Sequence, residues 1–302
     1  TQAVCGWTGY GPWKVTNCYL EAAGENFMVG GSDTGISNLT PSDIEFRNNY
    51  CFKPLTWKIG DPSYAGTAWT VKNLFELKHC QRVLVESNIF ENCWTHAQNG
   101  AAILFTALNQ SGGNPWAVVN DVTFTDNTVR NAEIGMQLSG HDHAGQVSPL
   151  SRRVNIYRNL LYNITVHLYE VTNGYTDVTI DHNTANNSGS VALLATGPWT
   201  MERFKFTNNI MDHGTYGVFG DGQSPGNASL DFYYPGCIFQ KNILAGGSAG
   251  SYPADNFFPA TLNDVGFVNI TNNADLRLAP SSIYNNAALD GTDLGADKAT
   301  PA

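Results

Sequence analysis

The chain of 302 residues carries 16 Lys and Arg against 26 Asp and Glu, a formal net charge of −10, and only 14% of its residues are charged. This acidic balance, with no basic run longer than Arg152-Arg153, argues against nucleic acid and anionic membranes as partners. No apolar run is long enough to insert into a membrane, and no linker divides the chain, so we expect a single domain over residues 1–302.

The N-terminal segment, residues 1–12, is rich in glycine and aromatic residues, and we interpret it as a cap or as the remnant of one. An uncapped end would expose strand edges and favour self-association through the ends of the coils. A start at Thr1 without Met suits a processed product, which makes a secreted, extracellular protein the expectation. Four cysteines between residues 18 and 93 could form a disulfide staple, and Cys237 aligns with core positions.

A short motif then recurs along the chain: an apolar residue, two variable residues, a fixed position that is nearly always Asn, one variable residue and an apolar residue. The fixed column reads Cys18, Asn49, Asn88, Asn127, Asn159, Asn183, Asn209 and Asn242. A second polar column follows four residues later, at Asn92, Asn131, Asn163, Asn187 and His213. Self-similarity of this kind indicates a solenoid, in which neighbouring repeats stack to bury a continuous core.

Apolar and polar residues alternate between the columns, as in Val178-Thr179-Ile180-Asp181, which is the period of strands. Asn suits the corner between two strands, because it tolerates left-handed backbone angles and its amide bonds locally. Stacked corner amides can donate on one side and accept on the other. The pattern therefore predicts an all-β solenoid of about eight coils over residues 13–270, held at one corner by an asparagine ladder.

This pattern resembles the right-handed parallel β-helix proteins of the pectate-lyase-like superfamily, whose coils are three short strands with asparagine ladders. The resemblance covers roughly residues 11 to 270 and leaves the reaction open, because one fold hosts many chemistries. Residues 271–302 look like the tail that closes many bacterial members. Asp290, Asp293 and Asp297 in that tail leave a Ca²⁺ ion as an alternative to a plain cap; otherwise no cofactor and no metal site is expected.

A second strand follows the ladder in each coil, and its inward pairs are expected to be Phe75/Leu77, Ile103/Phe105, Met136/Leu138, Tyr169/Val171 and Tyr216/Val218. Alternation then turns the polar residues between and directly after these pairs outward. These are Glu76, Lys78, Thr106, Gln137, Ser139, Glu170 and Thr172. Adjacent coils lie about 4.8 Å apart, so the outward residues form one polar strip suited to a long polymer.

Candidate catalytic residues come from this strip and from the loop after it. They are Glu170, Asp142, Lys78, Glu76, His141 and Arg152. Glu76 and Glu170 are about three coils apart, roughly 14 Å, which is too far for a glycosidase pair, whereas Asp142 lies one coil from Glu170. A lyase would instead need a base and a cation that neutralises a uronate, for which Lys78, Arg152 and the loop histidines are available.

Candidate substrate-binding residues come mainly from three insertions, residues 53–73, 95–118 and 139–151. They are Trp57, Trp69, Gln98, Trp116, Gln137 and His143. Aromatic rings beside polar groups suit sugar stacking and hydroxyl binding, although each Trp could equally fix its own loop. Signatures of polygalacturonases, of pectate lyases and of nucleophile-elbow hydrolases are missing.

The expected function is binding of a polysaccharide, with its degradation or modification by a lyase or a hydrolase reaction. The alternative is a non-catalytic extracellular structural, adhesion or filament-forming protein, whose outward strip is only a solvated face.

Overall fold

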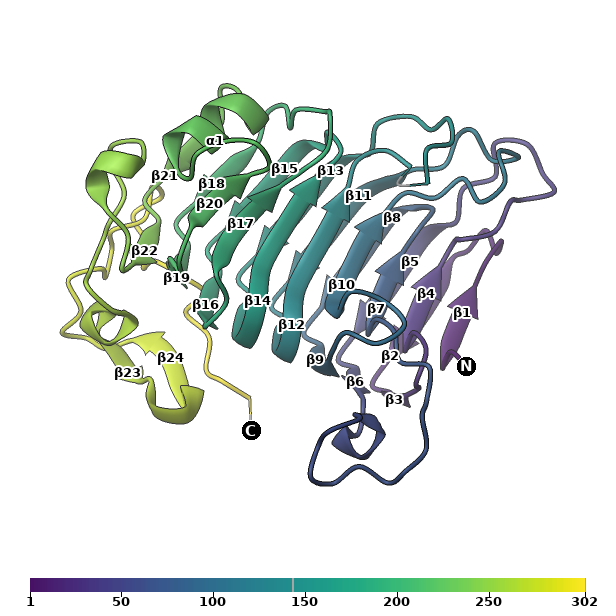
Figure 1. The fold of residues 1–302 in the computed structure, drawn as a ribbon, viewed down its shortest axis with the longest axis horizontal. Coiled ribbons are helices and arrows are strands. Elements are labelled where there is room, and N and C mark those ends of the chain that lie inside the picture. The colour runs from purple at the N-terminus through teal and green to yellow at the C-terminus, as the bar shows by residue number, and fades with distance from the viewer. Residues whose placement is uncertain (143, 302) are drawn as a thin grey trace.

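The computed structural model describes residues 1–142 and 144–301, which wind into a parallel β-helix (Figure 1). The predicted fold class is therefore confirmed. Each coil contributes strands to three faces. Face 1 begins with β2, face 2 with β3, and face 3 contains β1 and β4. The faces run parallel to the solenoid axis, so residues far apart in sequence become neighbours.

Face 1 contains eight parallel strands: β2 (Trp13–Thr16), β5 (Ser42–Arg47), β8 (Cys80–Glu86), β11 (Val119–Thr125), β13 (Arg152–Tyr157), β15 (Thr176–Asp181), β18 (Lys205–Thr207) and β21 (Ile238–Gln240). Face 2 contains β3 (Tyr19–Glu21), β6 (Tyr50–Phe52), β9 (Ile89–Cys93), the first parts of β12 (Thr128–Ser139) and β14 (Leu160–Thr172), β16 (Thr184–Asn187), β19 (Ile210–Asp212) and β22 (Ile243–Ala245). Face 3 contains β1 (Val4–Gly6), β4 (Phe27–Val29), β7 (Phe75–Leu77), β10 (Ala101–Thr106), the second parts of β12 and β14, β17 (Val191–Ala195) and β20 (Gly217–Gly220).

Strands β12 and β14 run without interruption around the corner between faces 2 and 3, where their pairing shifts register between Ala132 and Ile134. The remaining elements are η1 (Leu55–Trp57), α1 (Asn227–Tyr233), η2 (Ala249–Ser251), η3 (Leu262–Val265), η4 (Thr271–Asn273) and the antiparallel pair β23 (Phe267–Asn269) and β24 (Asp275–Leu278). In the described part of the chain, no helix has the length and apolar character needed to cross a membrane.

The core consists of inward side chains stacked from coil to coil. Phe27 and Phe75 stack at 5.0 Å between ring centroids, and Phe206 and Phe239 at 5.3 Å. The predicted inward pairs are buried, with one exception. Tyr216 is 44% exposed, because a register shift between β17 and β20 pairs Gly217 and Val218 with β17 and leaves Tyr216 before the strand.

The asparagine ladder forms at the corner between faces 1 and 2, as predicted. From Asn49 onward, each ladder residue donates its backbone N–H and its side-chain Nδ2 to Oδ1 of the next, at 2.8 to 3.2 Å. The ladder begins at Cys18, which donates its backbone N–H but no side-chain amide to Asn49 Oδ1, and it extends one rung beyond the prediction to Asn256. Buried amides are thereby satisfied along most of the molecule.

The prediction that left-handed backbone angles explain Asn at the ladder positions is wrong. The left-handed residue is the one that precedes each ladder position, at Asn17, Asn48, Ser87, Asp126, Arg158, His182, Asn208 and Lys241. The second column does not form a continuous ladder. Asn131 and Asn163 are exposed and joined by one bond of 2.8 Å, and both adopt left-handed angles at the second corner.

The C-terminal segment 284–301, which we call the strap, runs back along the outside of face 2. Leu289 and Gly295 donate backbone N–H groups to Asn208, Ala296 donates to Oγ1 of Thr184, and Pro301 accepts from Arg130 in β12. The strap covers an apolar outer surface, since Leu160 and Tyr162 pack with Ala296. The protein therefore has one hydrophobic core inside the β-helix and further apolar packing between the outer surface of face 2 and the strap.

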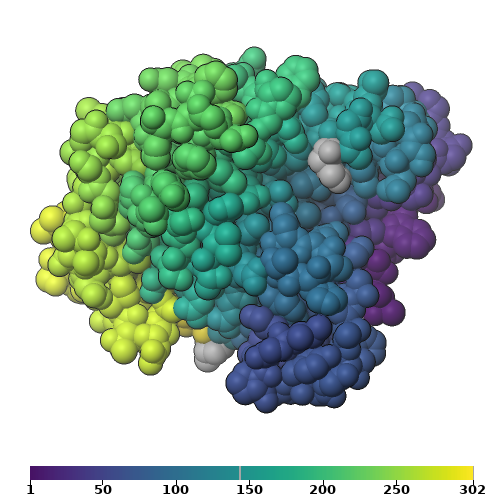
Figure 2. Space-filling model, viewed as in Figure 1, coloured from purple at the N-terminus to yellow at the C-terminus, as the bar shows by residue number. Residues whose placement is uncertain are grey.

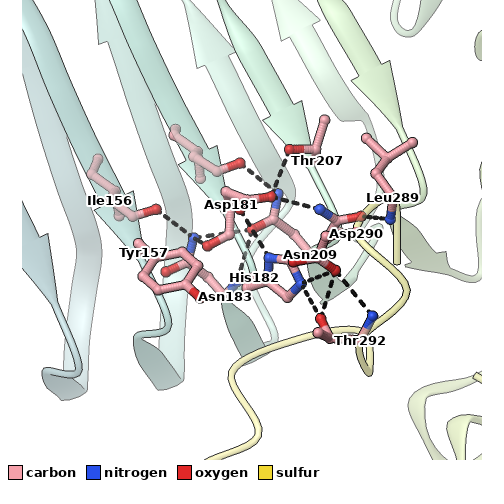
Figure 3. A network of polar contacts seen from close by, with 12 residues as sticks. Ile156, Tyr157, Asp181, His182, Asn183, Thr207, Asn209, Leu289, Asp290 and Thr292 are labelled. Carbon is pink, nitrogen blue, oxygen red and sulfur yellow. Dashed lines mark hydrogen bonds and ion pairs between the residues drawn. The ribbon is translucent and has the colours of Figure 1, made fainter. Parts of the chain in front are cut away.

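One polar network fastens the strap to the coils (Figure 3). Asp181 Oδ2 lies 2.9 Å from His182 Nδ1, and His182 Nε2 lies 3.0 Å from Thr292 Oγ1. Asp290 accepts from the hydroxyl of Thr292 at 2.7 Å. Asp181 and His182 thus precede the ladder residue Asn183 and also contact the tail, which the repeat pattern does not reveal.

All six cysteines are free thiols, so the disulfide staple considered from the sequence does not form. Cys51, Cys80 and Cys93 are buried, and burial raises the pKa of each. They pack as small apolar side chains in the core.

Candidate functional site

An axial row of side chains crosses the outer surface of face 3. Glu76 in β7, Leu104 in β10, Gln137 in β12 and Glu170 in β14 are register partners in successive strands. With about 4.8 Å between strands, Glu76 and Glu170 are roughly 14 Å apart. The structure thus aligns three residues of the predicted polar strip along the axis, with the apolar Leu104 between Glu76 and Gln137, and it places Thr106, Ser139 and Thr172 in a parallel row two residues further along their strands.

This row forms the floor of a cavity of about 440 Å³, which we call the face 3 groove. Its lining consists of Glu76, Lys78, Gln98, Asn99, Leu104, Thr106, Gln137, Ser139, Glu170, Thr172, Asn173 and Thr196. The loop between β9 and β10 supplies Gln98 and Asn99, and the amide of Asn99 donates to Gln137 Oε1 at 3.1 Å. Five of the predicted site residues therefore meet here.

Glu76 is a buried carboxyl group at one end of the groove. Its side chain is 1% exposed, its Oε1 lies 3.2 Å from Lys78 Nζ, and its Oε2 has no hydrogen-bond partner among the described residues. Burial raises the pKa of Glu76 to about 7, and the neighbouring Glu25 raises it too, while Lys78 acts in the opposite direction. Glu76 is therefore a carboxyl group that can exchange a proton near neutral pH.

Glu25 is a fully buried neighbour of Glu76 that sequence analysis missed. Its carboxylate lies 3.2 Å from Lys72 Nζ and accepts from Gln2 Nε2 at 2.9 Å. Burial alone would raise its pKa, but its hydrogen bonds and Lys72 lower it overall, so Glu25 holds the charge that opposes ionisation of Glu76. Because Glu25 lies outside the repeat motif, no local pattern signals it.

The turn that carries Glu25 is organised by a buried lysine. Lys53 Nζ donates to the carbonyl groups of Ala22 and Gly24 and, at 2.9 Å, to Oδ1 of Asn26. Burial lowers the pKa of Lys53 to about 8. An ammonium group enclosed by backbone acceptors is fully bonded, which makes it a structural support for the groove.

Glu170 forms a second acid–base pair with His167. Glu170 Oε1 lies 2.6 Å from His167 Nδ1, and His167 is half-buried, whereas the Glu170 side chain is only 8% exposed. His167 was missed because strict alternation along the strand does not apply at the corner, where the pairing of β12 and β14 shifts register. A carboxylate that holds one nitrogen of an imidazole leaves the other nitrogen available for proton transfer.

Three buried polar atoms that line the groove lack a hydrogen-bond partner among the described residues. They are Glu76 Oε2, Gln98 Oε1 and Thr106 Oγ1. Thr106 is 5% exposed. Such atoms are uncommon in folded proteins and require an explanation.

Three other predicted catalytic residues do not line this groove. Asp142 is buried in its own loop, and its carboxylate accepts backbone N–H groups from Asn109, Ala144 and Gln146. His141 stacks against Trp199 with ring centroids 4.7 Å apart. Arg152 belongs to β13 on face 1, so it points away from face 3.

The predicted tryptophans do not line the groove either. Trp57 and Trp69 pair with each other at 5.8 Å on segment 53–73, which projects from the body of the molecule (Figure 2). Trp116 donates its indole N–H to the carbonyl of Leu39 at 2.9 Å, which fixes its own loop. His143 lies outside the described residues. Trp199, which was not predicted, is 52% exposed beside His141.

A larger cavity of about 770 Å³ lies on face 1. Its wall includes residues from an axial row in which Asp and Arg alternate. These residues have left-handed backbone angles, and they form the ion pairs Asp43–Arg82, Asp121–Arg153 and Asp177–Arg203. These charges neutralise one another, and none of the described unpartnered atoms belongs to its lining. We therefore consider the smaller face 3 groove the stronger candidate site.

Within the described residues, no group of three or more His, Cys, Asp or Glu side chains is arranged to hold a metal ion. In the tail, Asp290 accepts a hydrogen bond from the backbone N–H of Thr292, and Asp293 accepts one from the backbone N–H of Asn286.

No protein-family model matches this chain, and no curated protein or solved structure is significantly similar to it.

Proposed function

We propose that this protein binds a polysaccharide along the face 3 groove, outside the cell, and cleaves or modifies it there. The proposal is carried by one observation: Glu76, Leu104, Gln137 and Glu170 form an axial row in a single cavity with amide side chains at its rim. A linear polymer can follow such a row from coil to coil. Membership of the pectate-lyase-like superfamily is part of the same proposal, and the asparagine ladder along the three-faced coils supports it.

Two centres of paired ionisable side chains support a chemical role. Glu76 with Lys78 and Glu170 with His167 both lie on face 3. At roughly 14 Å they are too far apart to act as the carboxylate pair of a glycosidase, for which about 5 to 9.5 Å is needed. Each centre would therefore act with its own partner.

The experiment measures binding and product formation separately. Affinity for soluble polysaccharides is determined by calorimetry, and products are followed by reducing sugar and by the absorbance of unsaturated ends. Gln137→Ala should weaken binding, whereas Asn155→Ala, an exposed residue on face 1, should not. Glu170→Gln should abolish product while leaving binding in place. Absence of binding to every polymer, or equal loss in both alanine variants, would refute the proposal.

A second candidate function, a self-associating structural protein, is favoured by the N-terminal end of the solenoid. In the described chain, β1, β2 and β3 each pair with one neighbouring strand only. Trp7 and Tyr10 are 55% and 68% exposed near this end. Light scattering between micromolar and millimolar concentrations distinguishes the two functions, because filament formation would give a mass that grows with concentration.

A further inference from the structure

The three unpartnered atoms of the face 3 groove come from different parts of the chain. Glu76 belongs to β7, Thr106 ends β10, and Gln98 lies in the loop before β10. Glu76 and Leu104 are register partners, so Thr106 lies on the strand next to Glu76 and two residues further along it. Three separate segments thus each contribute a residue with an unpartnered oxygen atom to the lining of one cavity.

A buried polar atom without a partner costs about 1 to 3 kcal/mol. Folding alone gains nothing from keeping three of them together, since valine in place of Thr106 would fill the same volume without the cost. Ligand binding gives a reason, because each atom then acquires a partner that the free protein does not provide. The hydrogen-bonding capacity of the three atoms therefore indicates which functional groups the ligand carries.

We propose that Glu76, Gln98 and Thr106 form a subsite that binds the hydroxyl groups of an uncharged sugar residue. This inference rests on the proposed polysaccharide-binding function of the groove. Gln98 Oε1 can only accept a hydrogen bond, and a hydroxyl at Thr106 can accept or donate. A polyhydroxy ligand supplies donors to these atoms and an acceptor for Thr106.

The charges around the subsite select against an acidic sugar. Lys78 is the one cationic side chain among the lining residues, and it is already paired with Glu76 at 3.2 Å. A uronate carboxylate would face the oxygen atoms of Glu76 and Gln98 without a free cation to neutralise it.

The test uses Thr106→Val, which removes the hydroxyl and keeps the shape. Because the lost group is unpartnered in the free protein, the melting temperature should stay the same or rise. Affinity for the neutral oligosaccharide that binds should fall about five- to tenfold, the value of one hydrogen bond. Weaker binding together with unchanged or greater stability is a combination that a merely structural residue would not give.

Thr128→Val is the matched control. Thr128 Oγ1 is also buried without a partner among the described residues, but Thr128 belongs to face 2. This variant should affect stability in the same direction and leave affinity unchanged. Gln98→Ala should weaken binding in parallel with Thr106→Val.

Calorimetry with neutral gluco-, manno-, xylo- and galacto-oligosaccharides and with oligogalacturonate and oligoalginate separates the outcomes. Tighter binding of a neutral oligosaccharide, reduced in Thr106→Val, supports the subsite. If a neutral oligosaccharide binds Thr106→Val as tightly as the native protein, or if the oligouronates bind more tightly, the subsite is refuted and the groove function stands. If no oligosaccharide of either kind binds, both proposals fail.

Discussion

Asn159 donates its backbone N–H and its side-chain Nδ2 to a single oxygen, Oδ1 of Asn183, at 2.9 and 3.0 Å, although 24 residues separate the two. The same amide of Asn159 also donates to the carbonyl of Phe124 in the preceding coil. One side chain thus joins three successive coils. Because all of these groups are buried, removing an interior rung leaves buried polar groups without partners and should destabilise the protein.

We predict that Asn159→Ala lowers the free energy of unfolding by about 3 kcal/mol, because the buried donors of Asn127 lose their acceptor. Asn256→Ala removes the last, partly exposed rung and should cost about 1 kcal/mol. Urea denaturation measures both. Equal effects at the two positions would show that the ladder does not stabilise the interior coils more than the end.

Glu76 should make stability depend on pH. Its folded pKa of about 7 lies above the unfolded value of 4.5, so its stabilisation is complete below pH 4.5 and is lost as the pH rises through 7. Relative to Glu76→Gln, the native protein should lose on the order of 3 kcal/mol between pH 4.5 and 8. Denaturation curves at several pH values check this. Glu202→Gln, at a side chain 62% exposed, should follow the native protein throughout.

Lys53 should be essential for the turn that carries Glu25. Lys53→Met leaves the buried carbonyl groups of Ala22 and Gly24 without their donor, so we expect a loss of about 3 kcal/mol or more. Lys14→Met, at a side chain 66% exposed, should cost less than about 1 kcal/mol. Thermal unfolding compares the two. A Lys53→Met protein as stable as the native one would contradict the structural role.

The strap should detach when its polar network is broken. Thr292→Val removes the contact to His182 Nε2 and the donor to Asp290, so limited proteolysis should cleave residues 284–301 several times faster than in the native protein. The coils should remain resistant, because their core does not include the strap. Thr67→Val, at an exposed position in segment 53–73, serves as the control. Cleavage at the same rate in both variants would mean that other contacts hold the strap.

The free thiols should differ sharply in reactivity. Cys5 is exposed, while Cys51, Cys80 and Cys93 are buried with raised pKa values. Burial also raises the pKa of Cys5 to about 11, so we expect slow alkylation of this residue at pH 8 and none at the three core thiols. Mass spectrometry after iodoacetamide treatment counts the labels. Six labels should be found in denaturant, and fewer would indicate a disulfide.

The amino-acid sequence by itself determined the solenoid, the ladder corner and the side of the strands on which Glu76, Gln137 and Glu170 lie. These features follow from local rules, namely period-2 alternation and a repeating corner residue, which need no knowledge of distant contacts. Alternation failed at Tyr216 and His167, where pairing between coils shifts register. A register shift depends on two strands, so neither strand contains it alone.

Only the tertiary structure decided which polar residues meet. Glu25 reaches Glu76 because Lys53, which lies between them in sequence, shapes a turn through buried carbonyl groups. Asp142 lies within a loop of the expected region, but its carboxylate bonds to backbone N–H groups of that loop and the neighbouring one instead of lining the groove. The strap binds His182 from more than a hundred residues away. Periodicity fixes which face a side chain occupies, whereas burial, charge and hydrogen bonding between distant segments fix its chemistry.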